Sequence, residues 1–434
     1  MFFVSCTTKP QNLPLLYDIG IRAYSLALQA ASPFHLKAKK WVKGRENLLA
    51  GIERKMQQET MPVAWFHCAS LGEFEQGRPL IEAFKTNYPN WKICLTFFSP
   101  SGYEIRKNYA LADYVFYLPE DTAANARAFI TAVKPQLAIF VKYEFWHYYM
   151  AELHHRQIPV LSVSAIFREN QVYFKPYGAF NRDILRKFTH FFVQNPESEK
   201  MLRGIGITNV TIAGDTRFDR VSAVAKTAKS LPLAQAFSGS AGVMVIGSSW
   251  PQDMEHLLPF MAAQKELKFI IAPHEIKEPD ILTIEQKFPG ETARYTKTTE
   301  TEVAGKRILI VDTIGLLSSL YQYGKFAFVG GAFGAGLHNT LEAATFGLPI
   351  FFGPNYGKFQ EAHDLIALGA AFSVTSTTEL SAAINKLFWS AKAYKLASAA
   401  SRNYVAGHVG ATNKIMKLVE HILPESTQNQ KPGK

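Results

Sequence analysis

The sequence predicts an α/β protein made of two doubly wound parallel sheets, with a cleft between the two domains. Its 434 residues are enough for two ordinary domains. Short apolar runs alternate with stretches of helical pattern, which is typical of parallel strands covered by helices on both faces. The alternation occurs in two successive series of similar size. Ligands of such sheets bind at the carboxyl ends of the strands, so we expect a site there.

Composition narrows the class of protein. With 47% hydrophobic and 19% charged residues the chain is globular, and its net charge of +11 favours an anionic partner. Nucleic acid is the least favoured partner, because no basic, aromatic or zinc-type recognition motif is present. The three cysteines, Cys6, Cys68 and Cys94, lack metal or disulfide spacing, which favours a reducing cytosolic setting. We find no signal peptide pattern and no apolar run long enough to span a bilayer.

The first segment predicted is 1–50, which we expect to associate with an anionic membrane surface. Residues 13–34 are apolar but interrupted by Asp18 and Arg22, and a basic stretch around Trp41 follows. An amphipathic segment beside a cationic patch suits such a surface. The alternative is a helix packed on its own domain with a solvated basic face. The cationic residues are Lys37, Lys39, Lys40, Lys43 and Arg45.

Two series of predicted strands follow. The first lies at 63–68, 92–98, 114–118, 136–141, 159–164 and 189–194. The second lies at 210–214, 242–248, 268–273, 307–312, 326–331 and 349–353. We therefore divide the chain into an N-terminal domain at 51–205, a C-terminal domain at 206–424 and a polar tail at 425–434, which we expect to be disordered.

The stretch 326–354 combines a buried strand, a glycine loop and a helix that we expect to begin at about Asn339. Backbone N–H groups in such a loop can face a phosphate. The glycines do not fit a first Rossmann turn and no Walker lysine is present. The alternative is purely structural, with Asn339 as an N-cap and Glu342 completing a capping box. The loop glycines are Gly330, Gly331, Gly334 and Gly336.

Two glutamates are expected at strand ends of the first domain. Glu73 follows the strand at 63–68 within Ser70-Leu71-Gly72-Glu73, where a carboxylate can take a proton from a hydroxyl nucleophile. Glu144 occupies a similar place after the strand at 136–141. The alternative for each is an ordinary first-turn glutamate favoured by the helix dipole.

The segment 214–219, Gly-Asp-Thr-Arg-Phe-Asp, lies at the expected domain junction. Arg217 is suited to clamp a phosphate or carboxylate, and the alternative is an ion pair with Asp215 or Asp219. Further polar residues follow strands of the second domain and are expected to converge with the glycine loop. They are Ser248, Ser249, His274, Asp312, Thr313 and Gly315.

In order and spacing, these motifs resemble the 3-deoxy-D-manno-octulosonic acid (Kdo) transferases. The resemblance runs from about Trp41 through the glycine loop and beyond. It rests on Ser-x-Gly-Glu at 70–73, Glu-aromatic-Trp at 144–146, the segment 214–219, Asp-Thr-x-Gly at 312–315 and the stretch GGA…HNTLEAA…P…GP. Arg217 stands where many members have Lys, and Ala272-Pro273-His274 stands where relatives have Pro-Arg-His.

The resemblance implies a GT-B fold and an enzyme that transfers Kdo from CMP-Kdo to a lipid A precursor, lipid IVA, with inversion and without metal or cofactor. It implies that Glu73 is the general base, that Ser70, Gly72 and Glu144 lie on the acceptor side, and that the cytoplasmic face of the bacterial inner membrane holds the protein. The implied donor-binding residues are Arg217, Ser248, Ser249, His274, Asp312, Thr313, Gly315, Gly330, Gly331, Gly334, Gly336, Asn339 and Glu342.

Two other functions fit the same architecture. One is a glycosyltransferase that uses a UDP-sugar, and the other is a sugar-nucleotide 2-epimerase. Competition between CMP and UDP separates the first from a Kdo transferase. Incubation with the donor alone separates the second, because an epimerase changes its sugar nucleotide without an acceptor.

Overall fold

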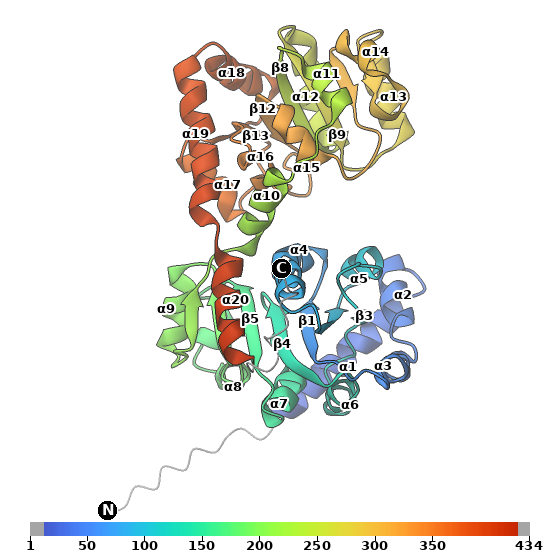
Figure 1. The fold of residues 1–434 in the computed structure, drawn as a ribbon, viewed down its shortest axis with the longest axis vertical. Coiled ribbons are helices and arrows are strands. Elements are labelled where there is room, and N and C mark those ends of the chain that lie inside the picture. The colour runs from blue at the N-terminus through green and yellow to red at the C-terminus, as the bar shows by residue number, and fades with distance from the viewer. Residues whose placement is uncertain (1–12, 424–434) are drawn as a thin grey trace, which may run out of the picture. The chain divides into compact units, whose positions relative to one another are not determined.

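The computed structural model describes residues 13–423, so the predicted tail at 425–434 lies outside the described residues. The chain forms two compact units (Figure 1). The first holds the described residues up to Arg217 and those from Gly410 onward. The second holds Phe218–Val409.

The first unit contains a seven-stranded parallel sheet in the order β3-β2-β1-β4-β5-β6-β7. The six strands predicted for this domain are confirmed. The run at 210–214, predicted to begin the second domain, instead forms β7 and pairs with β6. The strands are β1 (Val63–Cys68), β2 (Lys92–Phe97), β3 (Tyr114–Tyr117), β4 (Pro135–Val141), β5 (Val160–Ala165), β6 (His190–Val193) and β7 (Val210–Ile212).

The helices of the first unit include one from the far end of the chain. Helix α20 (Ala411–Ile422, red in Figure 1) packs on α4 (Leu71–Asn87) through buried Ile415, Met416 and Val419. The structure thus assigns the last described residues to the first unit, whereas the sequence placed 206–424 in one domain. The other helices are α1 (Leu13–Ala31), α2 (Leu36–Lys43), α3 (Leu48–Met56), α5 (Pro100–Arg106), α6 (Ala123–Val133), α7 (His147–His155), η1 (Val172–Phe174), α8 (Ala179–Leu185) and α9 (Pro196–Gly204).

The second unit contains another seven-stranded parallel sheet, in the order β10-β11-β9-β8-β12-β13-β14. The predicted runs at 242–248, 268–273, 307–312, 326–331 and 349–353 form its five central strands. The sequence missed the two edge strands, because each has three residues and little buried apolar surface. The strands are β8 (Gly242–Ser249), β9 (Leu267–Pro273), β10 (Thr292–Arg294), β11 (Ile308–Ile310), β12 (Phe326–Val329), β13 (Ile350–Phe352) and β14 (Ala371–Ser373).

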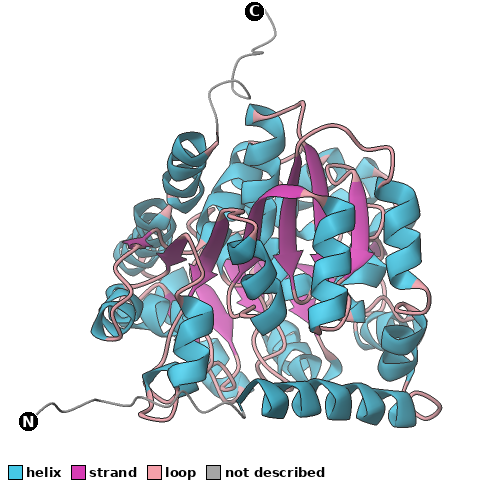
Figure 2. Cartoon of the chain, turned by 90° about the horizontal axis from the view of Figure 1, so that it is seen from below, coloured by secondary structure: helices cyan, strands magenta, loops and turns pink. Residues whose placement is uncertain are grey.

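Helices flank the strands (Figure 2), and neighbouring strand residues enter opposite cores. In β8, Val243 and Val245 join one hydrophobic cluster, whereas Met244 and Ile246 join the other. The continuous apolar strands are explained by this burial on both faces. The helices are α10 (Thr216–Lys226), α11 (Pro232–Ser238), α12 (Pro251–Ala263), α13 (Glu278–Lys287), η2 (Tyr295–Lys297), α14 (Glu300–Ala304), α15 (Leu317–Leu320), η3 (Tyr321–Tyr323), α16 (Leu341–Ala344), α17 (Gln360–Ala367), α18 (Thr377–Phe388) and α19 (Ala391–His408).

Two side-chain hydrogen bonds hold helix α1 against the rest of the first unit. The Tyr17 hydroxyl donates to Asp121 Oδ2 at 2.5 Å, and the Tyr148 hydroxyl donates to Asp18 Oδ1 at 2.6 Å. Burial raises the pKa of Asp121 to about 6, against the hydrogen bonds that favour its charge. Asp18 therefore belongs to the packing of this helix. Among residues 13–423 no helix is both long and apolar enough to cross a membrane.

Two residues of the basic stretch, Trp41 and Arg45, pack against the first unit. Trp41 is only 4% exposed, and the Arg45 guanidinium lies 3.9 Å from the centre of its ring. Arg45 donates to the carbonyl oxygens of Leu118, Trp41 and Phe98. Trp41 and Arg45 therefore follow the packed alternative, because both side chains hold α2 and the turn after it against the first unit.

Candidate active site

Glu73 lies in the first turn of α4, directly after β1. Ser70 is the N-cap in extended conformation, and its hydroxyl donates a hydrogen bond to the Glu73 carboxylate. Gly72 is exposed, and Glu73 is half-buried. Helix α4 approaches the sheet closely, since a Cβ at Gly77 would lie 3.0 Å from Val141 Cγ2 and 3.1 Å from Cys68 Sγ. A small residue at 77 thus brings the turn that carries Glu73 to the carboxyl end of the sheet.

Glu144 lies at the same sheet edge as Glu73. It follows β4, beyond Lys142, which has a left-handed φ of 66°. Its Oε2 is 3.2 Å from His67 Nε2 on the neighbouring β1. Burial, and then the carboxylates of Glu73 and Glu144, raise the pKa of the Cys68 thiol well above its ordinary value. Glu73 and Glu144 thus both lie beyond the carboxyl ends of neighbouring strands of this sheet.

Arg217 forms the ion pair that was the structural alternative. Its Nε and Nη2 each lie 2.8 Å from Asp215 Oδ2, and its backbone N–H donates to Asp215 Oδ1 at 2.9 Å. The neighbouring Thr216 hydroxyl donates to the carbonyl of Gln76 on α4. The segment 214–219 therefore ties the end of β7 to the helix that carries Glu73.

The glycine loop is held by a residue that the sequence did not single out. Asp253, on α12, is completely buried, and its Oδ2 accepts from the backbone N–H groups of Trp250 and Gly331, each at 2.8 Å. A Cβ at Gly330 would lie 2.6 Å from Ser249 Cα and 2.8 Å from Asp253 Oδ2, and also against the Ser248 carbonyl. Its position three residues after Trp250, at a helix start, was the available signal.

Several loop amides that were expected to face an anion are used inside the loop. The N–H of Gly330 donates to Gly247 O at 2.9 Å, and those of Gly334 and Gly336 donate to Gly331 O at 3.0 Å. Gly331, with a φ of 95°, gives its N–H to Asp253. The prediction that the N–H groups of these four glycines face a phosphate is therefore wrong, because the tight turn consumes them.

The helix after the loop is shorter and later than predicted. Helix α16 begins at Leu341 rather than at about Asn339, and it spans four residues. Asn339 Oδ1 accepts from the Leu341 N–H at 3.1 Å, and Asn339 Nδ2 donates to Glu342 Oε1 at 3.2 Å. The Ser318 hydroxyl also donates to Glu342 Oε2 at 2.8 Å. Asn339 and Glu342 thus lie side by side as one hydrogen-bonded pair.

Three aromatic rings stack beside the glycine loop. The ring centroids of Trp250 and His274 are 4.4 Å apart, and those of His274 and His338 are 4.5 Å apart. Trp250 Nε1 donates to His338 Nε2 at 2.9 Å, which leaves the His338 proton on Nδ1. Burial, and then His274, lower the pKa of His338 to about 4. His338 is thus a neutral N–H donor in a place where the sequence had indicated only its neighbour Asn339.

Only some of the predicted donor-binding residues lie close to one another. Ser249 O accepts from the His274 N–H at 2.9 Å, and Ser248 has a left-handed φ of 52° at the end of β8. Asp312 is used elsewhere, because its carboxylate accepts from the Thr296 N–H at 2.9 Å and from the Thr296 hydroxyl at 2.5 Å. Thr313 and Gly315, the latter with a φ of 88°, follow Asp312 after β11, two strands away from β8.

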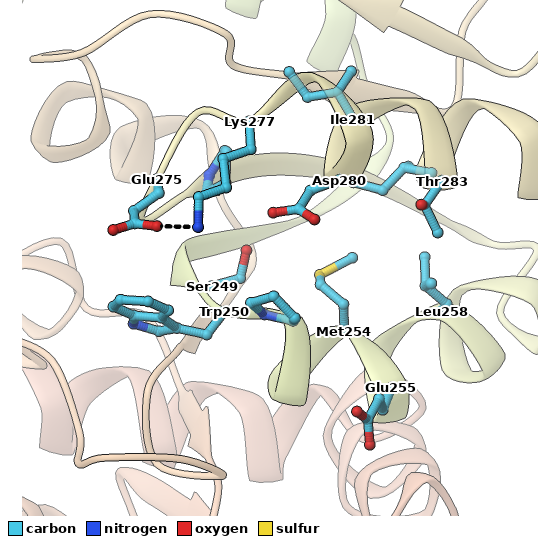
Figure 3. Close-up of a pocket in the computed structure, with 13 residues that line it drawn as sticks. Ser249, Trp250, Met254, Glu255, Leu258, Glu275, Lys277, Asp280, Ile281 and Thr283 are labelled. Carbon is cyan, nitrogen blue, oxygen red and sulfur yellow. Dashed lines mark ion pairs between the residues drawn. The ribbon is translucent and has the colours of Figure 1, made fainter.

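A cavity of about 290 Å³ opens between α12 and α13 (Figure 3). Met254 and Leu258 line it from α12, and Ile281 lines it from α13. Lys277 and Glu275 form an ion pair of 2.5 Å at its edge, and this contact lowers the pKa of Glu275. Of the predicted donor-binding residues only Ser249 lines this cavity. The cavity is therefore not the predicted donor-binding site.

Two doubly wound parallel units in one chain define a GT-B-type fold. The structure is similar to UDP-GlcNAc 2-epimerase from Neisseria meningitidis, with a TM-score of 0.59 and 15% identity over 83% of this chain and 100% of that one. It is also similar to MurG of Acinetobacter baumannii, with a TM-score of 0.54 and 12% identity over 83% and 99% of the two chains. The predicted fold class is confirmed.

Sequence comparison finds similarity to one family. Residues 44–220 match the family model of 3-deoxy-D-manno-octulosonic-acid transferase. The chain is 28% identical to the Kdo transferase of Aquifex aeolicus over 74% of its own length and 85% of the relative. It is 27% identical to that of Chlamydophila psittaci over 75% and 78%. The resemblance predicted from the motifs is confirmed.

Proposed function

We propose that the protein transfers Kdo from CMP-Kdo to a lipid A precursor, lipid IVA, with inversion, in lipopolysaccharide biosynthesis. The observation that carries this proposal is Glu73 in the first turn of α4, after β1, inside the segment 44–220 that matches the family. The similarity to Kdo transferases of other bacteria supports Kdo as the transferred sugar. The nucleotide, the acceptor and the stereochemistry are part of the proposal.

In the proposed reaction Glu73 is the general base. Its carboxylate takes the proton of an acceptor sugar hydroxyl, and the hydroxyl oxygen attacks the anomeric carbon of Kdo. The bond from that carbon to the phosphate oxygen breaks, and its electron pair leaves with CMP. A single displacement inverts the anomeric centre. The Ser70 hydroxyl donates a hydrogen bond to the Glu73 carboxylate and so holds it in the first turn of α4.

For the donor we propose the residues that follow the strands of the second unit. Ser248, Ser249, His274 and the loop at 330–336 lie together, and the neutral N–H of His338 adds a donor beside them. Asn339 and Glu342 are proposed to hold the sugar nucleotide as a hydrogen-bonded pair. The remaining proposed contacts are Arg217, Asp312, Thr313 and Gly315.

Catalysis without a divalent metal is also part of the proposal. CMP-Kdo has a single phosphodiester, so less charge must be neutralised than in a diphosphate donor. Arg217 supplies a cation for the donor. Its guanidinium also forms an ion pair with Asp215, so in this proposal it binds Asp215 and the donor at the same time. Turnover in excess chelator tests this point, and activity that collapses and returns with Mg²⁺ contradicts it.

For location we propose the cytoplasmic face of the inner membrane, reached through α1 and α2. Exposed apolar side chains lie on this segment beside the lysines of α2, and Phe34 is 92% exposed. They include Leu15, Leu16, Ile19, Leu26, Phe34 and Leu36. Apolar contacts together with cations are what an anionic interface binds.

Vesicle co-sedimentation tests the location. We expect binding to need anionic lipid, to weaken with salt and to fall in Phe34→Ala. Trp389→Ala is the matched control, because Trp389 is a large apolar residue, 73% exposed, on the second unit. Binding that ignores lipid charge and salt contradicts the proposal.

The decisive experiment for function combines CMP-Kdo with a tetra-acylated disaccharide lipid and measures the product mass. We expect the lipid to gain one or more Kdo residues. Incubation with a UDP-sugar alone tests the epimerase alternative, and competition by UDP rather than CMP favours a UDP-sugar transferase. Absence of Kdo addition with intact, folded protein overturns the proposal.

A further inference from the structure

A chain of hydrogen-bonded polar groups lies inside the first sheet, on two strands whose other buried residues are apolar. Trp65 and His67 lie on β1 and Thr96 lies on β2, and all three are completely buried. Thr96 Oγ1 is 2.8 Å from Trp65 Nε1 and 2.8 Å from His67 Nδ1. His67 Nε2 lies 3.2 Å from Glu144 Oε2. Buried polar groups are retained only when they are hydrogen-bonded, so this chain has a definite arrangement of protons.

The direction of these hydrogen bonds follows from what each group can donate. The indole of Trp65 only donates, so Thr96 Oγ1 accepts from it. The Thr96 hydroxyl hydrogen has two acceptors in reach, His67 Nδ1 at 2.8 Å and Phe66 O at 3.5 Å. The shorter bond places the hydrogen on the side of Nδ1, which leaves the imidazole proton on Nε2, facing Glu144.

Glu144 receives a second donor on the same oxygen. Trp146 Nε1 donates to Oε2 at 2.9 Å, and within residues 13–423 the hydrogen bonds to this carboxylate all reach Oε2. Two N–H donors on one oxygen suit the ionised carboxylate, which only accepts. The arrangement holds Oε2 inward and leaves Oε1 for a ligand.

We infer that His67 is a positioning residue that holds the Glu144 carboxylate in place as a hydrogen-bond acceptor for a sugar hydroxyl. This inference rests on the proposed function and deepens it, because it assigns the acceptor side a specific recognition element. The ligand chemistry is a hydroxyl donor, since Oε1 of a carboxylate fixed in this way accepts a hydrogen bond and cannot donate one.

Kinetics with purified full-length protein test the inference. A displacement of about 1 Å at a reacting group costs roughly 10²-fold in rate, so we expect His67→Leu to lower kcat about 10- to 100-fold. His67→Gln keeps an N–H donor and should recover at least half of that loss on a logarithmic scale. Glu144→Gln and the double variant His67→Leu/Glu144→Gln should be equally slow, because in both the amide oxygen turns to Trp146 Nε1 and the ligand meets an NH2 donor in place of an acceptor.

His190→Leu is the matched control. His190 lies on β6 of the same sheet, and its Nε2 is 2.9 Å from Thr211 Oγ1, so it is a strand histidine with a threonine partner but without a carboxylate. We expect kcat to be unchanged in this variant. Losses that add in the double variant at 67 and 144, or a His67→Gln variant no better than His67→Leu, overturn the inference.

Nitrogen-15 NMR of histidine-labelled protein keeps the inference testable without turnover. We expect His67 to be protonated on Nε2 and its Nε2 signal to shift in Glu144→Gln, while the His190 signals stay in place. A His67 signal with the proton on Nδ1 alone overturns the inference. Absence of Kdo transfer by wild-type protein overturns the proposed function instead, and the NMR result then stands by itself.

Discussion

Replacing Gly330 by Ala separates a packing role of the glycine loop from a role in ligand approach. The added Cβ would meet Ser248 O, Ser249 Cα and Asp253 Oδ2, and two of these three atoms belong to backbone. Backbone of a central strand cannot move aside cheaply, so the upper end of an overpacking penalty applies, about 3 kcal/mol. For a unit of the size of 218–409, that destabilisation lowers the melting temperature by roughly 6–12 °C.

Gly334→Ala is the control in the same loop. The nearest heavy atoms to a Cβ there lie 3.7 Å away, and its φ is not left-handed. Loss of unfolded-state entropy should stabilise this variant by about 0.4–1 kcal/mol. The assay is thermal unfolding followed by tryptophan fluorescence, with CMP binding measured by calorimetry on the same samples.

The two variants are expected to change the melting temperature in opposite directions. A Gly330→Ala protein that melts within about 2 °C of wild type refutes the packing reasoning. A Gly334→Ala protein with normal melting but much weaker CMP binding shows that the loop backbone approaches the ligand closely, although the N–H groups of its glycines are used within the turn.

Three further predictions concern the chemistry. Glu73→Gln should lower turnover by roughly 10²–10⁴ with CMP affinity unchanged, and a variant with near-normal turnover would remove Glu73 as the base. Arg217→Ala should lower kcat/KM by more than Arg217→Lys, which keeps the charge; equal losses in steady-state assays would contradict a charge role. His338 has a pKa of about 4 when folded, so the unfolded chain binds more protons between about pH 4 and 6.5. Wild type should therefore gain stability over His338→Gln as pH rises through that window, by at most about 1.4 kcal/mol per unit in urea unfolding, and a pH-independent difference would refute the shift.

The sequence by itself determined the two sheets and the edge at which chemistry can occur. Continuous apolar runs such as 63–68 and 242–248 indicate burial on both faces of a strand. Each run lies within one short segment, so it can be recognised in the sequence itself. The placement of Ser70 and Glu73 directly after a strand was likewise readable, because a strand end and a helix start are neighbours in the chain.

Only the tertiary structure decided which groups meet. His67 looks like an ordinary strand residue until Glu144, 77 positions later, is brought to its Nε2 by the pairing of β1 with β4. Asp253 caps its own helix and also takes the Gly331 N–H, 78 positions away. The strand at 210–212 and helix α20 joined the first unit through edges and apolar faces that composition does not distinguish. Hydrophobic pattern specifies that a face is buried, whereas the identity of its partner depends on strand order, which is a property of the whole fold.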